Sequence, residues 1–174
     1  ASEVSLNAAS ARRSDSPARL QGSLLLVDGR PFAPRAIEWQ GEPLGFLANL
    51  GFNAIHLEST PTDEQTLEAG RHDMWFICVP PRPDQLAREG FGKPNERVIG
   101  WYLKDELIET DPQYGANWAE LVRQHDGTPG RPILMARQAR WDAASKIADI
   151  VVAHNLRGAV LPIREFEDWL SGRA

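Results

Sequence analysis

The sequence predicts an α/β fold of the TIM-barrel type, with about six parallel barrel strands after an N-terminal β-hairpin. Its candidate strands are apolar throughout and are separated by helical segments of about ten residues, a pattern typical of a parallel sheet covered by helices. No GxGxxG or P-loop motif occurs, so a doubly wound nucleotide-binding sheet lacks its fingerprint. A closed barrel normally takes eight strands in about 250 residues. This chain of 174 residues is therefore predicted to form an incomplete or atypically closed barrel.

The beginning of the chain divides into two parts. Residues 1–20 are predicted to be a flexible N-terminal arm, because they show no hydrophobic periodicity and are rich in Ser and Ala. Residues 21–174 are predicted to form a single barrel-like domain. Within it, residues 23–27 form a short apolar strand, and Asp28-Gly29 is a strong signal for a hairpin turn. The returning segment 31–37 leads into the first barrel strand.

The rest of the domain repeats one unit, a buried strand followed by a helix. One helix carries a clear start signal, because the hydroxyl of Thr62 and the amide of Gln65 can satisfy free backbone donors in a capping box. The later predicted strands are 53–57, 74–79, 98–103, 131–136 and 150–153. The predicted helices are 42–50, 62–71, 83–89, 115–125, 141–148 and 163–170.

Composition and charge argue against several classes of partner and site. The net charge is -5, and the one basic cluster, Arg12, Arg13 and Arg19, lies in the arm, so nucleic-acid binding is not expected. No apolar run is long enough to span a membrane. Cys78 is the single cysteine, which excludes an internal disulfide and a Cys-based metal site. The chain opens on Ala1 rather than Met, which suits a processed or trimmed chain. Its localisation stays open, with a secreted or periplasmic location slightly favoured over a cytoplasmic one.

The candidate site residues follow the ends of the predicted strands. In a parallel barrel the carboxyl-terminal strand ends converge on one face, where the active site lies. These residues are Glu38, Trp39, Glu58, Asp105, Glu106, Arg137, Gln138 and His154. Trp39 and Trp101 could supply flat faces for sugar rings, although a Trp in a strand is more often part of the core. Glu38 and Glu58 could serve as catalytic carboxylates or simply form salt bridges, for example to Arg35 or Arg137.

Three segments resemble the catalytic barrels of glycoside hydrolases that carry a Glu after strand four. They are Val27–Phe32 (VDGRPF), Leu50–Leu57 (LGFNAIHL) and Gly100–Leu107 (GWYLKDEL), and the resemblance runs in order over about residues 23–153. In that family the Glu of the third segment is the general acid/base, so the resemblance implies this role for Glu106. Asp105 would be its supporting partner or a turn former. The chain also resembles barrel-like proteins of planctomycete-type bacteria whose function is undefined.

The sequence departs from this family in three places. Leu107 replaces a Pro, Lys104 replaces a small residue, and no strand seven, which carries the family's nucleophilic Glu, can be found. Two hypotheses therefore stand. One is a glycoside-hydrolase-like domain that acts on polysaccharide or derives from an enzyme that does. The alternative is a non-catalytic module that binds carbohydrate or protein on a degenerate barrel. Whether the chain is an enzyme stays open between them.

The chemistry of hydrolysis requires two carboxyl groups. They lie about 5–5.5 Å apart in retaining enzymes and about 6.5–9.5 Å apart in inverting ones, and one of them must hold a proton. His56 alternates with apolar neighbours and is interpreted as a satisfied core histidine. His154 has no second histidine at metal-ligand spacing, so a histidine-based zinc site is not predicted. No metal and no cofactor are expected.

An incomplete barrel leaves an open sheet edge and apolar surface that must be covered. We expect a second copy of the chain, in a homo-oligomer, or a C-terminal part to cover this edge. The candidate within the chain is the C-terminal segment that contains Phe166 and Trp169. Carbohydrate is the expected ligand, and neither nucleic acid nor membrane is expected as a partner.

Overall fold

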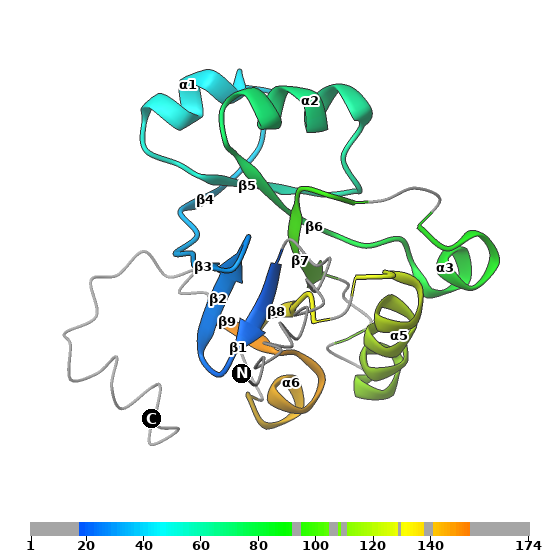
Figure 1. The fold of residues 1–174 in the computed structure, drawn as a ribbon. Coiled ribbons are helices and arrows are strands. Elements are labelled where there is room, and N and C mark those ends of the chain that lie inside the picture. Colours follow the sequence, from blue (N-terminus) through cyan, green and yellow to red (C-terminus); the bar gives the residue numbers. More distant parts are fainter. Residues whose placement is uncertain are drawn as a thin grey trace, which may run out of the picture.

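The computed structural model describes residues 18–91, 95–104, 108, 111–128, 130–137 and 141–153 (Figure 1). The strands are β1 (Ala18–Gln21), β2 (Leu24–Val27), β3 (Arg30–Pro31), β4 (Ala36–Glu38), β5 (Ala54–Leu57), β6 (Trp75–Cys78), β7 (Val98–Leu103), β8 (Ile133–Arg137) and β9 (Ile150–Ala153). The helices are α1 (Leu44–Asn49), α2 (Asp63–Arg71), α3 (Pro83–Glu89), α5 (Pro112–His125) and α6 (Trp141–Ile147). Within this part of the chain, no helix is long and apolar enough to span a membrane.

The main sheet has the strand order of a barrel. Among the described residues, six strands pair in the order β4-β5-β6-β7-β8-β9, and every pair is parallel. The order follows the sequence without the reversal that defines a doubly wound sheet. In Figure 1 these strands curl around one side of the molecule instead of lying flat. The prediction of an incomplete TIM-barrel-like α/β fold is confirmed.

The two faces of the parallel sheet pack against different layers. On β6, Phe76 and Cys78 belong to a core cluster that includes residues of all five described helices, whereas Trp75 and Ile77 belong to a second cluster drawn from the strands. Successive residues of a strand point to opposite faces, so this division follows from the sequence alternation. The helices therefore cover one face, and Ala18 and Val27 of the N-terminal strands pack against the other.

The N-terminal strands form a separate antiparallel sheet, β1-β2-β3 within the described residues. Asp28 and Gly29 have φ values of 49° and 76°, as the hairpin turn predicted at this position requires. The strand β1 begins at Ala18 and pairs with β2 over its length. Residues 18–20, the last three of the predicted flexible arm, thus lie in a strand. Residues 1–17 lie outside the described residues.

The helix boundaries follow the capping chemistry. The capping box predicted at Thr62 and Gln65 is present at the start of α2, with both reciprocal hydrogen bonds formed. Helix α5 begins earlier than the predicted 115, because Asp111 caps it and Pro112 occupies the first helical position. The predicted helix 163–170, with Phe166 and Trp169, lies outside the described residues.

A charged pair is buried beneath β7. Arg131 Nη1 donates to Asp126 Oδ1 at 2.5 Å, and the two side chains are only 1% and 5% exposed. The guanidinium of Arg131 also lies over the ring of Trp101, 5.5 Å from its centroid. Burial raises the pKa of Asp126, and the charge of Arg131 acts in the opposite direction. These contacts fix the amino-terminal end of β8 against β7.

Candidate functional site

The carboxyl-terminal ends of β4 and β5 place three polar side chains on the same face of the sheet. Glu38 is the register partner of His56 in the parallel pairing of these strands. Ile55 and Leu57 point into the core on the helix side, so His56 points to the opposite face. Glu58 lies two residues after His56, and a period of two places it on the same face as well.

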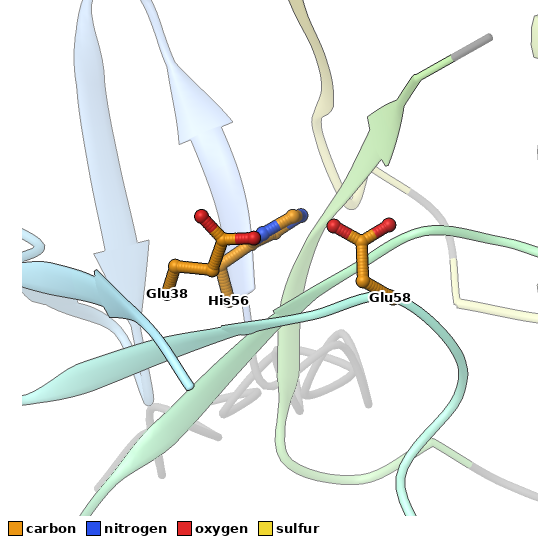
Figure 2. Close-up of side chains that lie close together, drawn as sticks. All are labelled: Glu38, His56 and Glu58. Atoms are coloured by element: carbon orange, nitrogen blue, oxygen red, sulfur yellow. The ribbon is translucent and has the colours of Figure 1, made fainter. Parts of the chain in front are cut away.

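These residues form a compact group, the Glu38–His56–Glu58 cluster. One ligand atom from each residue, a carboxylate oxygen or an imidazole nitrogen, lies within 4.8 Å of the other two. In Figure 2 the imidazole of His56 lies between the two carboxylates. Both glutamates are exposed and His56 is half-buried. The group therefore combines two acids and one base at a solvent-accessible position.

Tyr102 of β7 and Lys104, which follows this strand, lie at the same place. Lys104 Nζ lies 2.6 Å from Glu58 Oε1 and forms an ion pair with it. The ring of Tyr102 meets that of His56 edge-on, with 4.9 Å between the centroids and an interplanar angle of 77°. Arg35 and Arg137 were the salt-bridge partners expected from the sequence for such a glutamate. For Glu58 the partner is Lys104.

The surroundings of His56 favour its neutral form. Burial lowers the pKa of His56, and the charge of Lys104 acts in the same direction, while Glu58 and Glu38 oppose them. The hydrogen bond to Glu58 raises the pKa of Lys104. Nε2 of His56 is shielded from solvent and has no hydrogen-bond partner. The interpretation of His56 as a satisfied core histidine is therefore wrong, since its buried nitrogen lacks a partner.

The two tryptophans singled out in the sequence occupy different environments. Trp39 is half-buried and packs against the core on the helix side of the sheet, and its Nε1 donates to the carbonyl oxygen of Glu42 at 2.8 Å. Trp101 is 0% exposed and stacks on Phe91 with 4.5 Å between the ring centroids. The suggestion that Trp101 offers a face to a sugar ring is corrected, because its side chain points to the helix side of the sheet and belongs to the core.

The other predicted site residues follow the remaining strand ends. Glu106 and Asp105 come after β7, which is the fourth strand of the parallel sheet, as the family pattern requires. Both lie outside the described residues, as do Gln138 and His154. Arg137 is the last residue of β8. Of the predicted carboxylates, the structure thus brings Glu38 and Glu58 together.

A groove adjoins the cluster. It has a volume of about 470 Å³ and is lined by Glu58, by Lys104 and by residues of the segments that follow β5 and β6. Ser59, Thr60 and Arg82 add polar groups to its wall. The volume falls within the roughly 300–1,000 Å³ typical of small-ligand sites.

No protein-family model and no curated protein matches the chain. Solved structures similar in fold include three β-glucuronidases. The first is a β-glucuronidase from Ruminococcus gnavus in complex with an N1-substituted uronic isofagomine, with a TM-score of 0.60 and 14% identity. The second is a β-glucuronidase from Bacteroides uniformis, with a TM-score of 0.60 and 18% identity. The third is β-glucuronidase 2 from Bacteroides uniformis, covalently bound to a cyclophellitol-6-carboxylate aziridine, with a TM-score of 0.57 and 16% identity.

These similarities define the class of fold. They cover 90%, 86% and 86% of this chain, so most of it matches a barrel of the glycoside-hydrolase kind. The fold is glycoside-hydrolase-like, in agreement with the resemblance found in the sequence. The chain spans 35% of the first of these structures and 24% of each of the other two. No finding supports the resemblance to planctomycete-type proteins.

The sequence pattern alone indicated no functional role for His56 or Lys104. His56 was interpreted as part of the core because its neighbours are apolar, and Lys104 was noted only as a departure from the family pattern. One signal was present for His56, since it and Glu58 stand two apart across the end of a strand. No comparable signal existed for Lys104, whose partner lies 46 residues away.

Proposed function

We propose that this chain is a glycoside-hydrolase-like domain that binds a glycan at the carboxyl-terminal end of its parallel sheet and hydrolyses it. Glu106 would act as general acid/base, and Glu58 or Glu38 would be the second carboxylate. The observation that carries the proposal is the convergence of Glu38 and Glu58 at this end of a barrel-type sheet similar to those of β-glucuronidases. Fold similarity alone would not support a function, whereas paired carboxylates at the expected strand ends add the required chemistry.

The environment of each carboxylate suggests its role. Lys104 compensates the charge of Glu58, as suits a carboxylate that acts as nucleophile or stabilises positive charge on the sugar ring. The acid must instead deliver a proton to the glycosidic oxygen. The position of Glu106, after the fourth strand of the sheet, corresponds to that of the family's proton donor.

The groove beside Glu58 and Lys104 gives the glycan a place to bind. Its wall combines the hydroxyl groups of Ser59 and Thr60 with charged side chains, a mixture suited to the hydroxyl groups of sugars. We include β-glucuronides among the candidate substrates, because the neighbouring structures are β-glucuronidases.

The test replaces Glu106 with Gln and measures hydrolysis of a panel of aryl glycosides and polysaccharides that includes β-glucuronides. We expect a loss of about 100-fold or more in rate, because a positioned general acid contributes about 10²–10⁴-fold. Glu96→Gln, an exposed glutamate before β7, serves as the matched control and should keep wild-type activity. Hydrolysis that is unchanged in Glu106→Gln would remove this residue from the mechanism.

A second function is favoured by one specific contact. The ion pair with Lys104 occupies one oxygen of Glu58, so this carboxylate is already engaged in a contact within the protein. A non-catalytic module that binds carbohydrate or protein through the same face would have this property. A glycan array run beside the hydrolysis screen separates the two functions. Binding without turnover of any bound glycan would support the module, and turnover would exclude it.

A further inference from the structure

We propose that the Glu38–His56–Glu58 cluster is a binding site for a divalent transition-metal cation, of which Zn²⁺ is the representative. The inference goes beyond the proposed function and does not depend on it, since a cation can be bound whether or not a glycan is hydrolysed. It rests on the arrangement of three donor groups and on a buried nitrogen that has no partner.

The geometry allows one ion to contact all three residues. Ligand atoms lie at about 2.0–2.2 Å from Zn²⁺, so two ligands of one ion are separated by at most roughly 4.4 Å. The three donor atoms of the cluster already lie within 4.8 Å of one another. The two glutamates are exposed, and their side chains can close the remaining few tenths of an ångström by rotation.

The donor set selects the class of cation. An imidazole nitrogen with two carboxylate oxygens suits Zn²⁺, Mn²⁺ or Fe²⁺, whereas Mg²⁺ and Ca²⁺ prefer oxygen ligands throughout. Three protein ligands also leave a coordination position open for water or a ligand molecule, as in catalytic rather than structural zinc sites. The strand pairing contributes rigidity, because Glu38 and His56 are register partners on adjacent strands.

The second observation concerns His56 itself. Its Nε2 is shielded from solvent and has no hydrogen-bond partner, although a buried polar atom normally has one. The orphaned nitrogen and the two carboxylates belong to one group of side chains (Figure 2). A bound cation would satisfy an imidazole lone pair and reduce the repulsion between the two carboxylates at the same time.

Lys104 competes with the cation. Its Nζ lies 2.6 Å from Glu58 Oε1 and leaves the other carboxylate oxygen of Glu58 available. The lysine carries a positive charge, which repels a divalent cation bound nearby. Removal of the lysine charge should therefore strengthen cation binding. Removal of a carboxylate of the cluster, or of the imidazole of His56, should weaken it. A merely structural role for these residues would not produce opposite effects.

The experiment titrates the metal-free protein with Zn²⁺ by isothermal calorimetry at low salt, with Mg²⁺ and Ca²⁺ as comparison cations. We expect one Zn²⁺ per chain and much weaker binding of Mg²⁺ and Ca²⁺. Glu38→Gln and His56→Asn should each weaken Zn²⁺ binding by about tenfold or more, since loss of a supporting residue alone costs about 10–100-fold. Lys104→Met should strengthen it by about threefold or more.

Two exposed residues away from the cluster provide matched controls. Glu96→Gln removes an exposed carboxylate before β7, and His125→Gln removes an exposed imidazole at the end of α5. Neither should change the affinity for Zn²⁺. If His56→Asn does not fold, Glu38→Gln, a change at an exposed position, still tests the site. Zn²⁺ binding that is absent from the wild type, or unchanged in Glu38→Gln, would overturn the proposal.

The cation and the glycan can be tested apart. The titration uses no glycan, and the hydrolysis test depends on Glu106, which is not part of the cluster. A negative result for cation binding therefore does not contradict the proposed hydrolysis, and a negative result for hydrolysis does not contradict cation binding. A cation held by Glu38 and Glu58 would occupy the candidate second carboxylates, so added Zn²⁺ should inhibit any hydrolysis that uses them.

Discussion

Lys104 Nζ lies 2.6 Å from Glu58 Oε1, and this ion pair links the residue after β7 to the residue after β5. The two strands are not neighbours, since β6 lies between them in the sheet. The contact therefore crosses the concave side of the curled sheet at its carboxyl-terminal end. Curvature of a barrel-type sheet favours such a contact, because it turns the ends of β5 and β7 toward one another.

Replacement of Lys104 with Met should have little effect on folding. The side chains of Lys104 and Glu58 are 52% and 58% exposed, and exposed ion pairs contribute about 0–1 kcal/mol. Urea denaturation should therefore show a decrease of no more than about 1 kcal/mol in the free energy of unfolding. A loss well above this value would mean that Lys104 supports the fold, and ligand-binding results for the variant would then need a different explanation.

Replacement of Asp126 with Asn should destabilise the protein strongly. The change keeps the shape of the side chain and leaves the charge of Arg131 buried without its counterion. Loss of one partner of a buried pair typically costs about 3–5 kcal/mol. Chemical denaturation measures the loss. Asp84→Asn is the control, because the Arg88–Asp84 pair is 70% and 74% exposed and its loss should be barely measurable.

Replacement of Thr62 with Ala should weaken the start of α2. The hydroxyl of Thr62 accepts a hydrogen bond from the backbone N–H of Gln65, and this cap is lost in the variant. Loss of such a cap costs about 0.5–2 kcal/mol. Thermal unfolding monitored by circular dichroism should show a lower midpoint. Ser59→Ala, an exposed hydroxyl outside the helix, should leave the midpoint unchanged, and equal midpoints for both variants would contradict the role of the cap.

Cys78 should resist thiol reagents while the protein is folded. The side chain is fully buried, and burial raises the pKa of its thiol well above the usual range. Because the thiolate is the reactive form, a buried neutral thiol should react with Ellman's reagent only as the protein unfolds. We expect little colour from the native protein near pH 8 and one equivalent per chain in denaturant. Rapid reaction of the native protein would show that β6 opens readily.

Local patterns in the sequence predicted the elements well. The boundaries of α3 and β7 agree with those expected, because Pro83, Gly90 and the apolar run 98–103 give clear signals. The capping box at Thr62 is a contact within one turn of chain, so its chemistry is visible in the sequence. The early start of α5 was missed because the cap at Asp111 was not weighed against the later apolar residues. The strand β1 was missed because its order comes from pairing with β2, and its own composition is that of a tail.

The candidate site was only partly predictable. Glu38 and Glu58 were selected because carboxyl-terminal strand ends converge in any parallel barrel, and the structure brings these two together. Trp101 was offered as a sugar-binding face, and the structure buries it completely. The direction of a side chain in β7 depends on the phase of the alternation, and the register of β7 against β6 shifts at Phe76 and Ile77. This register shift is set by the packing of the strands, and no pattern in the sequence indicated it.

By itself, the sequence determined the class of fold and the order of its elements. Apolar runs of strand length, helices of amphipathic pattern and capping residues act over short stretches, so their effect is independent of the rest of the chain. Only the tertiary structure decided which polar groups meet. The grouping of Glu38, His56 and Glu58 with Lys104 depends on the register of β4 with β5 and on the curl of the sheet that carries β7 toward them. Distances between strand ends are set by the packing of all the strands together, and no local stretch of sequence contains them.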